Sequence, residues 1–331
     1  MENKAIPGMP GGEANQERRC LYIVVPCYKE EEVLPETAKR LREKMSSLMA
    51  QEKISPDSKV VFINDGSTDR TWEIICRFHE EDKLFCGINL SRNRGHQNAL
   101  LAGLMTARDY ADMVISMDAD LQDDIDAVDE MVNRYLEGYD IVYGVRSSRK
   151  KDSFFKRFTA EGYYKFIRFM GADVVFNHAD YRLMSKRALE GLSEFTEVNL
   201  FLRGIVPQIG YKSTVVTYER QERFAGESKY PLKKMLSLAF EGITSFSVKP
   251  IRMVANLGAI IAVVSVIFLI WSICVKLFGQ SVDGWSSLMA SIWLMGGLQI
   301  FCIGMIGEYV GKIYMETKHR PRYIIEQFLH D

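Results

Sequence analysis

Two aspartates one residue apart, Asp118 and Asp120, directly follow a short apolar stretch of this 331-residue chain. Such a pair can grip a divalent cation that bridges a diphosphate, and Gln122 adds a neutral amide oxygen two residues later. Mg²⁺ and Mn²⁺ prefer oxygen ligands and leave coordination positions open for phosphate oxygens. An Asp-x-Asp segment also arises by chance, because Asp is common in turns. The pair therefore predicts a metal site only together with other motifs.

A second polar segment, Asn64–Asp69, also follows an apolar stretch. Its Asp65 carboxylate is able to accept hydrogen bonds from a base or a ribose, and Gly66 allows the backbone to approach a ligand closely. The three residues after Gly66 would alternatively cap the helix that follows. Both interpretations hold together if one of those residues caps the helix while Asp65 binds the ligand.

Two further polar motifs occupy the same position relative to apolar stretches. Pro26–Glu30 places Tyr28 and Glu30 just past the first of them. Ser91–Gln97 holds Arg92 and a second arginine beside a glycine. Guanidinium groups suit bidentate contact with phosphate oxygens, although single arginines in loops are mostly solvated. Four polar motifs after four successive apolar stretches together predict one shared binding site.

The apolar stretches alternate with helical patterns along the chain. The predicted strands are Leu21–Val25, Val60–Ile63, Phe85–Leu90, Met113–Met117, Asp140–Gly144 and Val215–Tyr218. The predicted helices are Glu30–Gln51, Thr71–His79, Asn98–Arg108 and Asp124–Glu137, with a helical, aromatic-rich region over 151–211. Strands alternating with helices predict an α/β, Rossmann-like domain with a parallel sheet. Ligands of such sheets lie at the carboxyl ends of the strands, where the four motifs are.

Charge and cysteine usage narrow the function classes. The chain carries 42 Lys and Arg against 43 Asp and Glu, a formal net charge of −1. Binding to duplex nucleic acid normally shows as a basic surplus, so no nucleic-acid partner is expected. The six cysteines form no Cys-x-x-Cys pair and have no His cluster near them. This usage argues against zinc and suits a reducing cytosol.

The last part of the chain predicts a membrane anchor. Two long runs, about 253–275 and 284–308, contain no charged residue until Glu308 ends the second. A helix needs roughly 20 apolar residues to cross the hydrocarbon core, so the runs predict two transmembrane helices. The alternative is a pair of buried helices in a soluble domain, which would normally leave a polar stripe that neither run has. Basic residues outside the two runs place both ends of the anchor and the α/β domain in the cytoplasm.

The segment before the first run is amphipathic, which favours a helix at the membrane interface over an ordinary surface helix. The predicted organisation has five parts. They are a disordered leader at 1–19, an α/β domain that carries the polar motifs at 20–229, an interfacial helix at 230–251, the two-helix anchor at 252–311 and a cytoplasmic tail at 312–331.

The order of these motifs resembles the family-2 glycosyltransferases. The matching segments read P-C-Y-K-E at 26–30, N-D-G-S-T-D at 64–69, S-R-N-R-G-H-Q at 91–97 and D-A-D-L-Q at 118–122. The chain is most similar to the polyprenyl-phosphate branch, which includes dolichyl-phosphate mannose synthase and bactoprenol glucosyltransferases. Further matches lie at 180–184, 223–230, 307–311 and 320–323. The resemblance covers roughly residues 20–325. It implies that 20–229 is a catalytic, nucleotide-sugar-binding domain of the GT-A type.

The resemblance implies a donor site built from the polar motifs. A metal, Mg²⁺ or Mn²⁺, and the nucleotide diphosphate would be held by Asp118, Asp120 and Gln122. The residues that would line the nucleoside and phosphate pocket are Pro26, Tyr28, Glu30, Asp65 and Arg92. The sequence departs from the family pattern at Asn64, where Asp is frequent, and at Arg94, where an aromatic residue is common. Both departures leave the nucleotide base open.

The resemblance also implies an acceptor side. Asp180 and Arg182 would lie near the donor sugar and the acceptor phosphate, and they join Asp120 as the catalytic residues. A mobile loop would close over the phosphates with Arg223, Ser228 and Lys229. Because a phosphate acceptor is already anionic, a deprotonating base is less necessary, so Asp180 is assigned to orientation with base catalysis as the lesser alternative.

The predicted function is inverting, metal-dependent transfer of a sugar from a nucleotide-sugar to undecaprenyl or another polyprenyl phosphate. It takes place at the cytoplasmic face of the inner or plasma membrane, by a multi-pass protein. UDP-glucose leads among the donors, followed by UDP-N-acetylglucosamine and then GDP-mannose. A homo-oligomer, up to a tetramer, is expected. The alternatives are a processive polysaccharide synthase and a non-catalytic membrane scaffold. Such synthases usually carry a Q-x-x-R-W motif, and the nearest candidate segment here, Gln221–Phe224, lacks the Trp.

Overall fold

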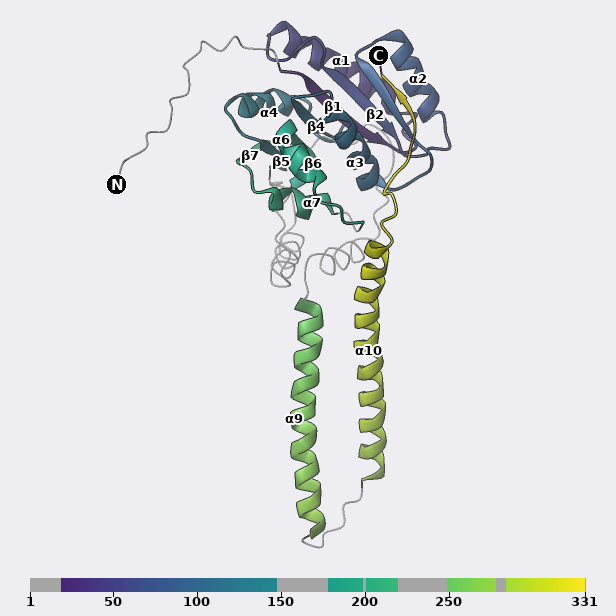
Figure 1. Ribbon diagram of the computed structural model, residues 1–331, viewed down its shortest axis with the longest axis vertical. Helices are drawn as coiled ribbons and strands as arrows, with labels where there is room; N and C mark the ends of the chain where they lie inside the picture. Colours follow the sequence, from purple (N-terminus) through teal and green to yellow (C-terminus); the bar gives the residue numbers. More distant parts are fainter. Residues whose placement is uncertain (1–18, 148–177, 199–200, 220–248, 278–283, 331) are drawn as a thin grey trace, which may run out of the picture.

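The structure, a computed structural model, describes residues 19–147, 178–198, 201–219, 249–277 and 284–330. An α/β domain lies at one end of the molecule, and two long helices, α9 (Lys249–Leu277) and α10 (Trp285–Thr317), extend from it side by side (Figure 1). Several predictions fall outside the described residues. These are most of the leader and of the interfacial helix, the aromatic-rich segment after residue 151, and Arg223, Ser228 and Lys229.

The described residues of the α/β domain form one eight-stranded sheet in the order β7-β5-β6-β4-β1-β2-β3-β8. Its centre consists of four parallel strands. They are β1 (Leu21–Cys27), β2 (Lys59–Asn64), β3 (Phe85–Leu90) and β4 (Met113–Ser116). The remaining strands are β5 (Ile141–Arg146), β6 (His178–Ser185), β7 (Ser213–Tyr218) and β8 (Ile325–Leu329). The predicted α/β class is thus confirmed.

The sheet is mixed, so the prediction of an all-parallel sheet is wrong at two strands. Strand β6 runs antiparallel to β4 and β5, and β8 runs antiparallel to β3. The helical pattern predicted across 151–211 is likewise wrong at β6. In that strand Asp180 and Arg182 are buried polar residues that interrupt the apolar pattern of a central strand. Strand β8 lies in the stretch predicted as a tail. It pairs with β3, although the two strands are far apart in the sequence.

Helices cover both faces of the sheet, because side chains alternate between the faces along each strand. On β1, Leu21, Ile23 and Val25 pack into one layer of the core, while Tyr22 and Val24 pack into the other. The first face is covered by α1 (Leu34–Ala50), α2 (Thr71–Glu81) and α4 (Ala127–Leu136). The second is covered by α3 (His96–Ala107), α6 (Lys186–Ser193), α7 (Leu202–Ile205) and the 3₁₀ turn η1 (Val206–Ile209).

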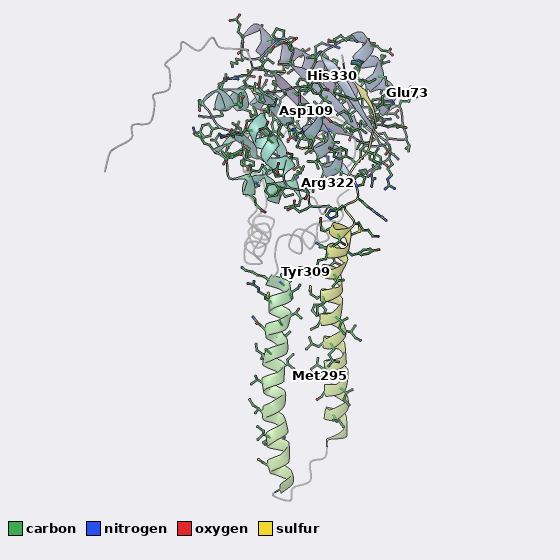
Figure 2. The ribbon with its side chains drawn as sticks, in the orientation of Figure 1. Glu73, Asp109, Met295, Tyr309, Arg322 and His330 are labelled. Atoms are coloured by element: carbon green, nitrogen blue, oxygen red, sulfur yellow. The ribbon has the colours of Figure 1, made fainter. Side chains whose placement is uncertain are left out.

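The two long helices carry the predicted membrane anchor. Judged by length and composition alone, the stretch Leu294–Thr317 of α10 is the one helical segment among the described residues that could cross a membrane. Figure 2 shows its side chains, with Met295 far from the α/β domain and Tyr309 nearer to it. The first predicted span, 253–275, lies within α9. A two-span anchor therefore remains a proposal.

Candidate active site

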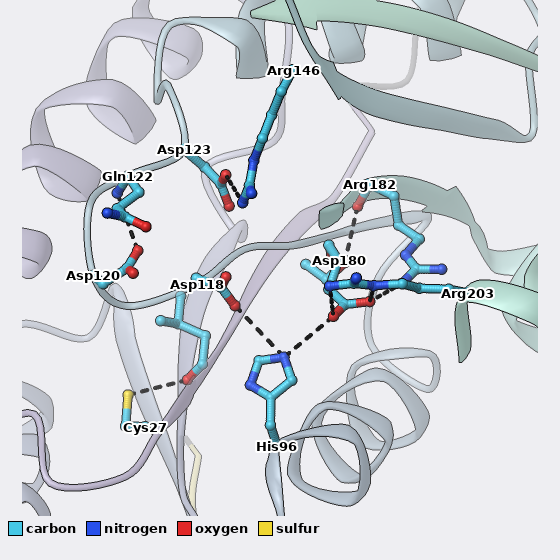
Figure 3. Close-up of polar contacts among 12 residues, drawn as sticks. Cys27, His96, Asp118, Asp120, Gln122, Asp123, Arg146, Asp180, Arg182 and Arg203 are labelled. Carbon is cyan, nitrogen blue, oxygen red and sulfur yellow. Dashed lines mark hydrogen bonds and ion pairs between the residues drawn. The ribbon is translucent and has the colours of Figure 1, made fainter. Parts of the chain in front are cut away.

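The loop after β4 brings Asp118 beside the start of α3. His96, the first residue of that helix, places its Nε2 atom 3.6 Å from Asp118 Oδ1 and 3.6 Å from Asp180 Oδ2 (Figure 3). Burial alone would lower the pKa of His96, but the hydrogen bond to Asp180 and the charge of Asp118 raise it above its usual value. His96 thus links the carboxylate after β4 to the one on β6.

Asp180 is bound by cations from three directions. Arg182 Nη2 lies 2.6 Å from its Oδ1, and Arg203 Nη2 lies 3.0 Å from its Oδ2, the oxygen that His96 also faces (Figure 3). Burial favours the neutral acid, yet His96 and the two guanidiniums outweigh it and hold the pKa of Asp180 well below its usual range. The carboxylate is therefore ionised at neutral pH and makes a poor proton acceptor.

The two arginines beside Asp180 differ in what they expose. The Arg182 side chain is 1% exposed and also donates from Nη1 to the Leu202 carbonyl (3.4 Å). The Arg203 side chain is 44% exposed. The Arg182 side chain therefore exposes almost no surface to a ligand, and its predicted place near the acceptor phosphate stays a prediction.

The electrostatics around Asp118 fit a bound cation. Partial burial together with the carboxylates of Asp123, Asp180 and Asp120 raises the pKa of Asp118 to about 6, while His96 opposes the rise. Carboxylates that repel one another in this way favour a divalent cation, and their oxygens are hard ligands suited to Mg²⁺ or Mn²⁺. No group of three or more His, Cys, Asp and Glu side chains within the described residues is arranged to hold a metal by protein ligands alone.

Asp65 has a structural partner that its predicted role did not include. Its two carboxylate oxygens accept hydrogen bonds from the backbone N–H groups of Arg94 (2.7 Å) and Gly95 (2.9 Å). The side chain thereby fixes the loop that leads from β3 into α3 and His96. Gly66 has φ +62°, and a Cβ there would lie 2.4 Å from the Asn93 nitrogen, so only glycine fits this close crossing of two loops.

The remaining predicted donor-site residues lie near the same ends of β1 and β3. Pro26 is buried within β1, whereas Tyr28 and Arg92 are exposed in the loops that follow. The backbone N–H of Glu30 donates to Thr71 Oγ1 (3.1 Å) at the start of α2. Asp120 Oδ1 accepts from the Gln122 backbone N–H (3.1 Å), which holds the loop after β4 in a tight turn.

Sequence reasoning missed three residues of this site: His96, Asp123 and Arg203. Asp123 is buried, accepts from Tyr218 Oη (2.5 Å) and faces Arg146 Nη2 at 3.5 Å, which ties the loop to β7 and β5. His96 lies inside the S-R-N-R-G-H-Q motif, which is the one sequence signal that could have indicated it. The predicted helix begins at Asn98, whereas α3 begins at His96. No local signal marked Arg203, because its partner Asp180 is 23 positions away on another element.

A mixed α/β sheet whose carboxyl ends carry paired carboxylates and cations defines a GT-A-like domain. Residues 22–193 match the family described as glycosyl transferase family 2, and residues 249–313 match the family described as GtrB C-terminal hairpin. The chain belongs to glycosyl transferase family 2. It is a glycosyltransferase, as the sequence predicts.

Relatives of the chain extend over nearly its whole length. It is 53% identical over 311 residues to the "Uncharacterized glycosyltransferase YkoT" of Bacillus subtilis, covering 94% of this chain and 92% of the relative. It is 41% identical over 308 residues to a bactoprenol glucosyl transferase of Shigella phage SfV, covering 92% and 98%. Among solved structures, a mannosyltransferase of Pyrobaculum calidifontis in complex with GDP-Man and Mn²⁺ is 15% identical with a TM-score of 0.44, covering 89% and 88%.

Proposed function

We propose that the protein transfers a hexose from a nucleotide-sugar to a polyprenyl phosphate, with inversion at the anomeric carbon. The relatives named bactoprenol glucosyl transferases support this acceptor class, and UDP-glucose is the donor we place ahead of UDP-N-acetylglucosamine. One observation carries the proposal: His96 lies 3.6 Å from both Asp118 and Asp180. We assign Asp118 to the donor side and Asp180 to the acceptor side. Both carboxylates face the same imidazole, and we propose that the two anionic substrates react beside it.

On the donor side, Asp118, Asp120 and Gln122 would hold Mg²⁺ or Mn²⁺ together with the nucleotide diphosphate. The metal, when bound, supplies neutralisation of the charge on the departing diphosphate. Asp65 would not contact the donor directly. Its carboxylate holds the loop of Arg94 and Gly95, which we expect to border the nucleoside pocket. We expect Tyr28 and Arg92, both exposed, to line that pocket.

On the acceptor side, the reaction needs little proton transfer. A phosphate monoester has its second pKa near 6, so it arrives largely as a dianion ready to attack. The low pKa of Asp180 accords with this, because an ionised carboxylate of that strength accepts a proton poorly. The task of Asp180 is then to orient the surrounding cations, which would otherwise repel one another. We therefore propose that Asp180 orients these groups and does not act as a catalytic base.

The long helices would meet the lipid. Large apolar side chains are exposed along both, for example Ile260 on α9 (61%) and Ile300 on α10 (73%). Such exposure is unfavourable in water, so we expect this surface to be covered by lipid or by other copies of the chain. We propose that α9 and α10 both span the membrane, that the domain within 20–229 lies in the cytoplasm, and that the protein forms a homo-oligomer, up to a tetramer.

A transfer assay tests the proposal. Purified full-length protein is incubated with Mg²⁺ or Mn²⁺, undecaprenyl phosphate and a panel of labelled nucleotide sugars. We expect label in a lipid product with one donor, and its disappearance when a chelator is added. Label in a long polymer would favour a processive synthase instead. Absence of product with every donor would remove the support for a polyprenyl-phosphate transferase.

A further inference from the structure

We propose that Arg203 binds the phosphate of the acceptor and that the buried Arg182 positions it for that task. The inference rests on the proposed function, since it names the acceptor site of the same reaction. It follows from four observations around Asp180: the exposure of the two arginines, the hydrogen bonds that hold α7, the location of α7 beside the long helices, and the charge of the two arginines.

The first observation is the difference in access. Arg203 contacts both oxygens of Asp180, with Nη2 at 3.0 Å and Nε at 3.3 Å, while 44% of its side chain is exposed. Asp180 thus fixes one edge of the guanidinium and orients the group. A guanidinium presents five N–H donors in a rigid fork that matches phosphate oxygens. Arg182, at 1% exposed, has no such surface.

The second observation explains what Arg182 does. The backbone of Leu202, the residue just before Arg203, is held from both sides. Its N–H donates to Gln97 Oε1 (3.0 Å), and its carbonyl accepts from Arg182 Nη1 (3.4 Å). Because α7 is a short helix of four residues, these contacts set where it begins. Arg182 is therefore a positioning residue that acts on Arg203 through both Asp180 and the Leu202 peptide.

The third observation is the direction of approach. Helix α7 lies at the end of the α/β domain from which α9 and α10 extend (Figure 1). The segment that precedes α7 is bound to the end of α10 and to the chain beyond it. The Val198 N–H donates to Glu316 Oε2 (2.8 Å), and Arg322 Nη2 donates to the Phe195 carbonyl (2.6 Å). A phosphate whose isoprenoid tail stays in the bilayer would come from this side and meet Arg203.

The fourth observation is the charge of the two arginines. The two guanidiniums stay protonated at every relevant pH, and both contact the carboxylate of Asp180. Because 44% of the Arg203 side chain is exposed beside that carboxylate, its positive charge is accessible to an anionic ligand. A phosphate dianion suits such a guanidinium.

Steady-state kinetics on the full-length protein tests the proposal. Arg203→Gln removes the charge and fork, Arg203→Lys keeps only the charge, and Arg187→Gln removes another surface arginine that pairs with an aspartate, Asp140. For Arg203→Gln we expect the KM for undecaprenyl phosphate to rise about 10- to 100-fold while the KM for the nucleotide-sugar stays unchanged. Arg203→Lys should recover part of the loss, and Arg187→Gln should match the wild type.

A binding measurement without catalysis completes the test. Binding of a short-chain polyprenyl phosphate in detergent is followed with chelator present and donor absent. Arg203→Gln should weaken this binding by a similar factor, and Arg187→Gln should not. An unchanged acceptor KM and unchanged binding in Arg203→Gln would overturn the inference, as would an equal rise in the donor KM. If instead the wild type makes no lipid product from any donor, the proposed function itself fails.

Discussion

Asn89 on β3 donates a hydrogen bond from its side-chain amide to Glu326 on β8, a residue 237 positions later in the chain (3.0 Å). Asn89 Oδ1 in turn accepts from Asn64 Nδ2 (2.7 Å), and Asn64 Oδ1 accepts from the Ser67 N–H (3.2 Å). A chain of hydrogen bonds thus joins the C-terminal strand to the loop that contains Asp65. It also gives the asparagine at position 64 a structural role that an ionised carboxylate would not fill, because the side chain both donates and accepts.

The docking of β8 predicts that Phe328→Ala destabilises the catalytic domain. Phe328 lies opposite Ile88 in the strand register, and its ring is 6.0 Å from that of Tyr110. It is only partly buried, so we expect a loss of about 1–2 kcal/mol, below that of a full core site. Thermal unfolding in detergent measures it. Ile324→Ala, which removes a side chain that is 50% exposed, is the control and should leave the Tm unchanged. Equal effects of the two variants would mean that β8 does not pack as described.

The centre of the sheet could be predicted because each of its strands has a recognisable local sequence pattern. β1 to β4 are apolar runs buried on both faces, and each is followed by a polar loop. Their predicted positions agree with the structure to within a few residues at each end. The helix predicted from Glu30 begins at Leu34, where Pro35 occupies the first turn. The polar loops fall at the carboxyl ends of the parallel strands because topology requires it.

The rest could not be read locally because it depends on partners far along the chain. Asp180 and Arg182 are polar in sequence, and they are buried in the core because they pair with each other within β6 and with residues of other elements. β8 is a short segment with no strong strand pattern of its own, and it becomes a strand by pairing with the edge of β3. Likewise, Arg203 becomes part of the site only when β6 and α7 meet. A sequence pattern carries the periodicity of one element, not the charge of the element that packs against it.

Asp120→Asn is predicted to abolish transfer and to leave the protein folded. The amide keeps the shape but removes the charge needed to hold a divalent cation, so we expect turnover to fall by about 1,000-fold, equivalent to several kcal/mol of lost stabilisation. The transfer assay measures the activity, and thermal unfolding shows that the fold persists. Asp109→Asn, which alters an aspartate that is 63% exposed and lies outside the site, should behave as the wild type. Retained turnover in Asp120→Asn would sink the metal assignment.

Gly66→Ala is predicted to disturb the nucleotide-binding loops more than its backbone conformation alone explains. Gly66 and Gly138 both have positive φ, +62° and +87°, and each costs about 1 kcal/mol to replace. A Cβ at Gly66 would also meet the Asn93 nitrogen at 2.4 Å, whereas nothing lies within 4 Å of one at Gly138. We therefore expect Gly66→Ala to lower the Tm further than Gly138→Ala and to weaken donor binding. Identical Tm changes and unaltered donor affinity would show that the loops do not cross here.

The low pKa of Asp180 predicts a stabilisation that disappears in acid. Its pKa lies below the ordinary value of 3.8 because His96, Arg203 and Arg182 outweigh the effect of burial. The contribution is therefore fully present above the unfolded pKa and is lost as the pH falls through the folded one. Asp180→Asn leaves the charge of Arg182 buried, so we expect it to cost about 2–4 kcal/mol at pH 7. The gap between wild type and variant, followed by unfolding from pH 7 to pH 3, should narrow below about pH 4. A gap that stays constant over this range would mean that Asp180 is not ionised in the folded protein.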